Sequence, residues 1–177
     1  DRVVPGGVAV DLGAEGRRSI AAEIDALEPE YERLVRIYDE NSSLEDRVRA
    51  TGILTPEKAR DLGTVGFVAR ASGLNTDARV FHPFPPYDRA DLFDFTVPVL
   101  ISGDVHARAW VRVEEVRESL RIIRFILEHL PEGGLRAAME TPPPGSAGFS
   151  AVEGWRGEIV TWLQAGPRGE VNRCMVR

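Results

Sequence analysis

Two long stretches of the chain place apolar residues three and four positions apart, which is the spacing of one buried helix face. The first stretch contains Ile20, Ile24, Leu27, Tyr31, Leu34 and Ile37, and the second contains Val113, Val116, Leu120, Ile123, Leu127 and Leu130. We expect Ser19 to cap the first helix, because its hydroxyl can accept a free backbone N–H. Pro29 either kinks this helix or begins a second one at its first turn. Ser102 or Asp104 is expected to cap the other long helix, which the sequence at 131–134 ends.

Shorter helices are predicted between these two stretches. One follows Asn41-Ser42-Ser43 and ends at Gly52, and another has Thr55 as N-cap with Pro56 at its first position and stops at Gly63. Residues 64–102 are rich in Gly, Pro and aromatic residues and lack a sustained helical period. We therefore expect an extended segment packed on the helices, with one short strand at 95–100.

The last thirty residues have a β-type pattern. Residues 158–163 and 170–176 flank the turn-forming segment 165–169, so a hairpin is predicted, and residues 147–155 are expected to add a third strand. Consecutive prolines at 142–144 favour a stiff, extended connector before it. The pattern predicts an α+β fold over 1–177 as a single domain, with a helical part at 1–140 and a small antiparallel β part at 147–177.

Composition narrows the class of protein. The chain has 177 residues, of which 43% are hydrophobic and 28% charged, values typical of a globular domain. Its formal net charge of -6 argues against nucleic acid as a partner. No stretch approaches the roughly 20 apolar residues that a membrane helix needs. The first five residues lack the order of a signal peptide, and we interpret this start as a cut inside a longer protein.

Residues that could bind a metal or cofactor are few. His82, His106 and His129 are the three histidines, and none lies at ligand spacing from another. Cys174 is the one cysteine; it cannot form an internal disulfide, which fits a reducing compartment, and we interpret it as a buried or partly buried structural thiol. The glycines at 5–7 and 13–16 lack the arrangement that binds NAD or ATP, and we interpret Pro5-Gly6-Gly7 as a tightly packed turn. We therefore assign no catalytic, cofactor-binding or metal-ligating residue.

One concentrated group of polar residues lies in the 64–102 segment. It contains Arg70, Asp77, Arg79, Tyr87 and Asp88. These residues either form the edge of a site that supports a redox centre or docks a partner, or form arginine–carboxylate bonds that order the segment. The second interpretation is favoured because a long irregular segment needs internal ties. On the second long helix, the i,i+3 pairs Glu114–Arg117 and Glu118–Arg121 suggest a solvated or inter-subunit face.

An ordered series of residues resembles a known family. The series consists of Val65-Gly66-Phe67-Val68-Ala69-Arg70-Ala71-Ser72-Gly73, Asp77, Arg79, Tyr87-Asp88, Val97-Pro98-Val99, Gly103-Asp104 and the helical residues 111–123. It resembles the middle of the large subunit shared by NADH:quinone oxidoreductase, where it is the D-type subunit, and by [NiFe]-hydrogenases of the formate hydrogenlyase type. In addition, residues 153–158 resemble the hydrogenase-like branch more closely.

The resemblance implies an oxidoreductase parent whose chemistry lies elsewhere in the large subunit. Hydrogenases of this family bind nickel and iron through two CxxC pairs, and neither pair is present here; the residues that meet quinone lie upstream of the matching segment. We therefore expect no cofactor in this segment and no activity of the isolated chain. The implied setting is a cytoplasmic arm, peripheral to the inner face of the membrane, that pairs with a small iron–sulfur subunit.

Two other interpretations stay open. The chain could be a stand-alone interaction scaffold descended from such a large subunit, or an independent small-molecule enzyme built around the polar residues at 70–88. For the excised chain we expect self-association or a large exposed apolar patch, because terminal segments that would cover its helices are missing.

Overall fold

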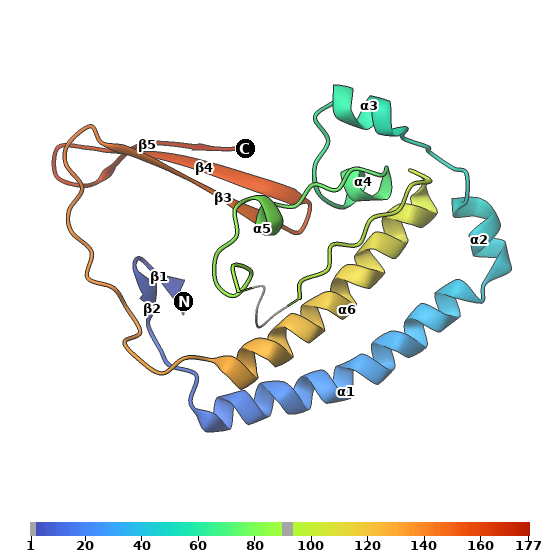
Figure 1. Cartoon of the computed structure of the whole chain (residues 1–177), viewed down its shortest axis with the longest axis horizontal. Coiled ribbons are helices and arrows are strands. Elements are labelled where there is room, and N and C mark those ends of the chain that lie inside the picture. The colour runs from blue at the N-terminus through green and yellow to red at the C-terminus, as the bar shows by residue number, and fades with distance from the viewer. Residues whose placement is uncertain (1–2, 90–93) are drawn as a thin grey trace.

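The computed structural model describes residues 3–89 and 94–177, and it shows an α+β fold, as predicted. Two long helices, α1 (Ala14–Asp39) and α6 (Val105–His129), run antiparallel side by side (Figure 1). The short helices α2 (Ser42–Val48), α3 (Pro56–Asp61), α4 (Gly66–Ala71) and α5 (Ala78–Phe81) lie between them in sequence. A three-stranded antiparallel sheet with the order β3-β4-β5 follows α6.

Helix α1 differs from the prediction at its start and at its proline. It begins at Ala14 after the N-cap Gly13, so Ser19 lies inside the helix and is not its cap. Pro29 lies within one continuous, gently bowed helix (Figure 1). Pro29 and Asp25, the residue whose carbonyl group the proline leaves without a helical partner, are both exposed. Of the predicted stripe Ile24 is buried, whereas Leu27, Leu34 and Ile37 are exposed.

Helix α6 begins after Asp104, whose carboxylate accepts a hydrogen bond from the Ala107 N–H at 2.7 Å. This confirms one of the two expected caps. Its buried residues are Ala107, Val111, Leu120 and Ile122. Of the predicted stripe Leu120 is therefore buried, Ile123 is exposed, and the other four members are partly buried. The reason is that α6 packs against α1 and also against α4, which buries more than one stripe. Ala71, Ala107 and Val111 form the centre of the core, with Phe67 against them.

The predicted cap of α3 is confirmed: Thr55 caps it, with Pro56 at its first position. Helix α2 begins at Ser42 and ends at Val48, slightly earlier at both ends than predicted, and Asn41 caps it by accepting from the Leu44 N–H.

The segment predicted to be extended contains two helices, α4 and α5, and residues 95–100 form no strand. Both helices are too short, at six and four residues, for a period to show in the sequence. Residues 95–100 are extended, but their hydrogen bonds go to helix and loop: Leu100 N–H donates to the Arg70 carbonyl at 2.9 Å, and Thr96 N–H donates to the Glu118 carboxylate at 3.0 Å. A strand ladder therefore cannot form there.

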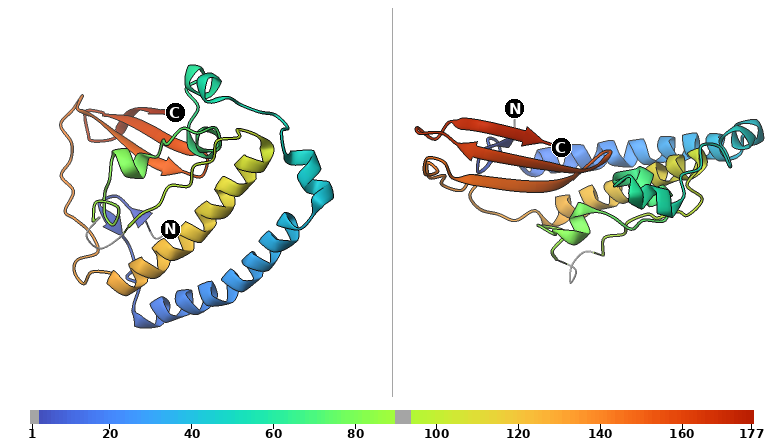
Figure 2. Two further views of the ribbon diagram at one scale, coloured as in Figure 1. Left: turned by 45° about the vertical axis from the view of Figure 1, so that its right-hand side comes forward. Right: turned by 90° about the horizontal axis from the view of Figure 1, so that it is seen from above.

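The sheet consists of β3 (Ala147–Gly154), β4 (Gly157–Ala165) and β5 (Val171–Val176), which confirms the hairpin and the third strand. The register places Phe149, Trp162 and Met175 in one row on one face, while Val152 and Ile159 pair on the other. Phe149 is 78% exposed and Met175 is 65% exposed. Apolar side chains thus remain exposed on both faces of the sheet, which lies as a separate layer beside the helices (Figure 2).

A small hairpin of β1 (Val3–Val4) and β2 (Gly7–Val8) is held by the connector that follows α6. Gly7 forms a β-bridge with Arg136, and Val8 N–H donates to the Leu135 carbonyl at 3.0 Å. A Cβ on Gly7 would lie 2.2 Å from that carbonyl oxygen, and its φ of +155° also favours glycine. The interpretation of Pro5-Gly6-Gly7 as a tightly packed turn is therefore confirmed.

No helix within residues 3–89 and 94–177 combines the length and the apolar character needed to cross a membrane.

Candidate functional site

The guanidinium of Arg70 lies at the centre of a buried ion network. Its side chain is fully buried at the end of α4. Nη1 donates to Glu153 Oε1 at 2.9 Å, to the Thr76 carbonyl at 3.0 Å and, at 3.4 Å, to Asp77. Nη2 donates to Glu115. One arginine therefore joins a carboxylate from α6, one from β3 and one at the start of α5.

Each partner of Arg70 is positioned by its own element. Asp77 is the N-cap of α5, where its carboxylate accepts from the Arg79 N–H. Glu153 comes from β3, and its second oxygen accepts from the Ala78 N–H at 3.0 Å. Glu115 lies in the middle of α6. The network therefore connects α4, α5, α6 and the sheet, and it satisfies the backbone at the start of α5.

A close backbone contact between the start of α4 and the β3–β4 turn positions the sheet next to the Arg70 network. Gly66 begins α4 with a φ of +66°, and a Cβ there would lie 2.1 Å from the Arg156 carbonyl oxygen in the β3–β4 turn. A side chain at Gly66 would therefore push the turn away from α4. Because Glu153 precedes this turn closely in the chain, the contact at Gly66 helps to keep its carboxylate within reach of Arg70.

Arg79 extends the network towards the surface. Its Nε and Nη2 donate to the two oxygens of Asp77 at 2.9 and 2.7 Å, and its guanidinium lies 4.5 Å from the centre of the Phe95 ring. Burial alone would lower the pKa of Arg79, but the bonds and charge of Asp77 outweigh it and raise that pKa above its ordinary value. The Tyr87 ring centre lies 5.9 Å away, whereas Asp88 is exposed and takes no part in the hydrogen-bonded network of the described residues.

The network carries an excess of carboxylates. Arg70 and Arg79 face Asp77, Glu115 and Glu153, so three acidic groups share two guanidinium groups. Burial raises the pKa of Glu115 above its ordinary range, and the charges of Arg70 and Arg79 oppose this without cancelling it. A cleft of about 250 Å³ opens beside Glu115 and Glu153.

The sequence located part of this site. Arg70, Asp77 and Arg79 do come together, and their arrangement as arginine–carboxylate bonds that order the segment is observed. Glu115 and Glu153 were missed as members, because they are 45 and 83 positions from Arg70 and no local spacing connects them. Glu115 follows the buried Val111 by one helical turn, on a face of α6 that the predicted apolar stripe did not include.

The charged face of α6 serves contacts within the chain more than the sequence suggested. Arg117 donates to both oxygens of Glu32 on α1, at 2.8 and 2.7 Å, and Arg124 donates to Asp25 and Glu28. The predicted i,i+3 pairs Glu114–Arg117 and Glu118–Arg121 are present as well. The two long helices are thus joined by ion pairs at the edge of their interface.

The histidines and the cysteine lie outside this network. His106 is near the start of α6 beside Tyr38 and Trp110, and His129 stacks on Phe125 at its end. His82 is the exposed C-cap of α5. Cys174 is exposed on β5, so its interpretation as a buried or partly buried thiol was wrong; β5 is an edge strand that nothing described covers.

These donors do not fit a thiolate-bound metal centre. Such centres require several cysteines, and the sequence has one. Within the ranges that the structure covers, no three histidine, cysteine or acidic side chains are grouped so that they could bind a metal ion.

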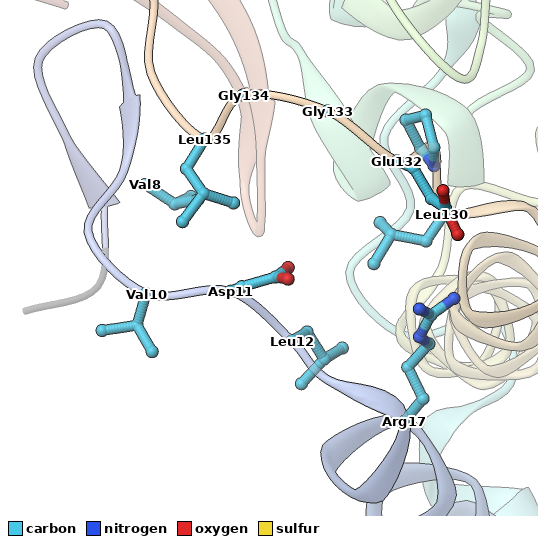
Figure 3. A pocket seen from close by; sticks show the side chains of 11 residues that line it. Val8, Val10, Asp11, Leu12, Arg17, Leu130, Glu132, Gly133, Gly134 and Leu135 are labelled. Atoms are coloured by element: carbon cyan, nitrogen blue, oxygen red, sulfur yellow. The ribbon is translucent and has the colours of Figure 1, made fainter.

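A larger cleft, of about 520 Å³, lies between the start of α1 and the connector after α6 (Figure 3). Asp11 and Arg17 reach into it from one side, and Leu130 and Leu135 from the other. The nearby glycines of the β1–β2 turn pack against the connector backbone. They therefore serve chain packing and do not form a loop around a phosphate group.

Comparison of the sequence with known families identifies the chain as a member of a respiratory-chain family. The family described as "Respiratory-chain NADH dehydrogenase, 49 Kd subunit" matches residues 1–175. The chain belongs to this family, as the ordered series of residues had indicated.

Curated relatives come from both branches of the resemblance. A carbon monoxide-induced hydrogenase of Rhodospirillum rubrum is 36% identical over 160 residues, which are 90% of this chain and 44% of that protein. The D-type subunit of NADH-quinone oxidoreductase from Desulfitobacterium hafniense is 33% identical over 174 residues, 97% of this chain and 46% of the relative. The C/D-type subunit of the same enzyme from Aeromonas salmonicida is 38% identical over 154 residues, 84% of this chain and 25% of the relative. The chain thus spans less than half the length of these relatives.

Proposed function

We propose that this chain is the central structural segment of a redox-enzyme large subunit of the hydrogenase-like branch, which lies against a small iron–sulfur subunit when electrons are transferred. The observation that supports the proposal is the position of Arg70 at the centre of the buried ion network. Arg70, Asp77 and Glu115 belong to the series that resembles the family, and they connect helices and sheet to one another. Residues that connect several elements in this way stabilise the fold, and this structural role is the one proposed for the segment.

Under the proposal, the redox chemistry of the large subunit takes place outside this segment. The described donor residues do not fit a nickel–iron centre, and the relatives are more than twice as long as the matched region. A nickel–iron centre or a quinone contact would therefore belong to the part of such proteins that this sequence does not match. The isolated chain is expected to be inactive.

The branch is argued from residues 153–158. They read Glu153-Gly154-Trp155-Arg156-Gly157-Glu158 and contain the turn between β3 and β4 that packs on Gly66. This version resembles the hydrogenase-like branch. The second candidate is a segment of the D-type subunit of NADH:quinone oxidoreductase, which the names of several relatives favour. A stand-alone scaffold derived from either is the third.

The proposal includes a location and partners. The parent complex would lie in the cytoplasm, peripheral to the inner face of the membrane, and would be attached through partner subunits. The names of the relatives support a place in a multi-subunit complex, because they describe D-type and C/D-type subunits of an oxidoreductase.

Affinity purification of the tagged parent protein from its own cells tests the proposal. We expect a small iron–sulfur subunit to co-purify, with stoichiometric nickel by elemental analysis. Co-purification without nickel would transfer the assignment to the quinone-reducing branch. Failure to recover an iron–sulfur partner, or turnover by the isolated 177-residue chain, would contradict the structural role.

A further inference from the structure

The cleft of about 250 Å³ beside the Arg70 network has an acidic wall and an aromatic rim. Glu115, Ser119 and Glu153 line it together with Arg79, and Trp155 stands at its edge with 64% of its surface exposed. Its volume lies below the ~300–1,000 Å³ that is usual for small-molecule pockets. A single polar side chain from another protein is therefore a better fit in size than a free cofactor.

The carboxylate oxygens of the network do not all accept a hydrogen bond. Both oxygens of Glu153 accept hydrogen bonds, from Arg70 and from the Ala78 N–H, and both oxygens of Asp77 accept from Arg79. Glu115 accepts from Arg70 through Oε1 alone. Its Oε2 has no hydrogen-bond donor among residues 3–89 and 94–177, although the side chain is 16% exposed and lines the cleft.

The charge balance of the network also favours a further positively charged group beside Glu115. Three carboxylates share two guanidinium groups, so one negative charge is left uncompensated in a largely buried cluster. Buried charges are stable when they are paired, and Glu115 is the carboxylate of the three that keeps an oxygen without a donor among the described residues, beside the cleft. Burial raises the pKa of Glu115, and the charges of Arg70 and Arg79 do not cancel this. Arg79 also lines the cleft, but its guanidinium is already bound to both oxygens of Asp77 and lies against the Phe95 ring.

We propose that this cleft receives an arginine side chain of a partner protein, whose guanidinium donates to Glu115 Oε2 and lies on the indole ring of Trp155. A guanidinium suits both surfaces because it is planar, donates charge-assisted hydrogen bonds to carboxylates and stacks on aromatic rings. The inference names the chemistry of a partner, so it rests on the role in a complex that is proposed above.

Titration of the full chain with methylguanidinium chloride tests the inference without any partner protein. The readouts are the Trp155 indole N–H and the Ser119 amide in ¹H–¹⁵N spectra, with ionic strength held constant by sodium chloride. We expect saturable shifts at both positions with a millimolar Kd. Methylurea, which has a similar shape and no charge, should produce none. Absence of saturable shifts with methylguanidinium, or equal binding of methylurea, overturns the inference.

Two variants and a matched control identify the site. Glu115→Gln removes the charge and keeps an oxygen for Arg70, and it should weaken methylguanidinium binding at least tenfold. Trp155→Ala changes an exposed residue, so it should fold, and it should weaken binding several-fold as seen at the Ser119 amide. Glu128→Gln, on the exposed surface of α6, changes net charge equally and should leave binding unchanged. If Glu128→Gln weakens binding as much as Glu115→Gln, the attraction is non-specific and the inference fails. These outcomes are independent of whether the parent protein binds nickel or an iron–sulfur protein.

Discussion

Nη1 of Arg70 lies 2.9 Å from Oε1 of Glu153, although the two residues are 83 positions apart in the chain. Both side chains are buried, at 0% and 4% exposure. Because a buried ion pair loses much of its value when one partner is removed, this contact ties the position of the sheet to that of α4. Loss of either charge should therefore affect the whole molecule and not only the sheet.

Replacing Glu153 with glutamine should lower the free energy of unfolding at pH 7 by about 3 kcal/mol, since it leaves Arg70 with one fewer buried counter-charge. Urea denaturation followed by circular dichroism measures the change. The control is Glu158→Gln, at the position directly opposite Glu153 in the β3–β4 register and without an ion pair among the described residues. That variant should stay within about 0.5 kcal/mol of the natural chain. Equal losses in the two variants would contradict a special role for the buried pair.

Asp104 should make the chain sensitive to acid. Burial would raise its pKa, but hydrogen bonds from the N–H groups of Ala107 and Ala50 and from Ser102 outweigh burial and lower that pKa. A lowered pKa in the folded state gives stability that is present above about pH 4 and is lost as the pH falls through the folded value. The natural chain should therefore be more stable than Asp104→Asn at pH 6, and the difference should shrink towards pH 3. A difference that does not change with pH would contradict this.

Glu115 should show the opposite pH dependence. Its pKa is raised, so the folded state binds the proton more tightly than the unfolded state does, and the associated stability is lost as the pH rises from about 4 through the folded value. The stability of the natural chain relative to Glu115→Gln should decrease as the pH rises above about 4 and level off once the pH exceeds the folded value. Urea titrations at half-unit pH steps measure this, and an increase over the same range would show that the ion pair with Arg70 dominates burial.

Self-association of the isolated chain is expected to come from the sheet. Phe149 and Met175 are exposed on either side of Trp162 in one cross-strand row. Light scattering over a concentration series should show an average mass that rises with concentration, and the double variant Phe149→Ser with Met175→Ser should reduce the rise. Leu62→Ser removes a similarly exposed apolar side chain from the C-cap of α3 and should have little effect. A monomer at every concentration would disprove the expectation.

Local chemistry made two helix caps and the hairpin predictable. Thr55 and Asp104 each cap a helix through a side-chain oxygen, and the loop after β4 is bounded by residues that favour a turn. Such features depend on a few adjacent residues, so the sequence is sufficient to identify them.

The features that the sequence did not predict depend on contacts between segments that are distant in the chain. Leu27 and Leu34 follow the helical period but are exposed, because α1 has a neighbour on one side among the described elements, while α6 is packed on two. Residues 95–100 have the composition of a strand, yet their backbone bonds go to α6 and to the end of α4. Glu115 and Glu153 join Arg70 through tertiary packing that no local pattern encodes. Several residues of the series that resembles the family are members of the buried network, and the structure was needed to reveal this role.

Within the described sheet, strand β5 has a neighbour on one side alone, and all six of its residues are exposed. Its pairing with β4 continues beyond its last residue, through reciprocal hydrogen bonds of 2.9 Å between Val160 and Arg177. The outer side of β5 is thus an extended backbone edge that can accept another strand by main-chain pairing, without any rearrangement of the helices.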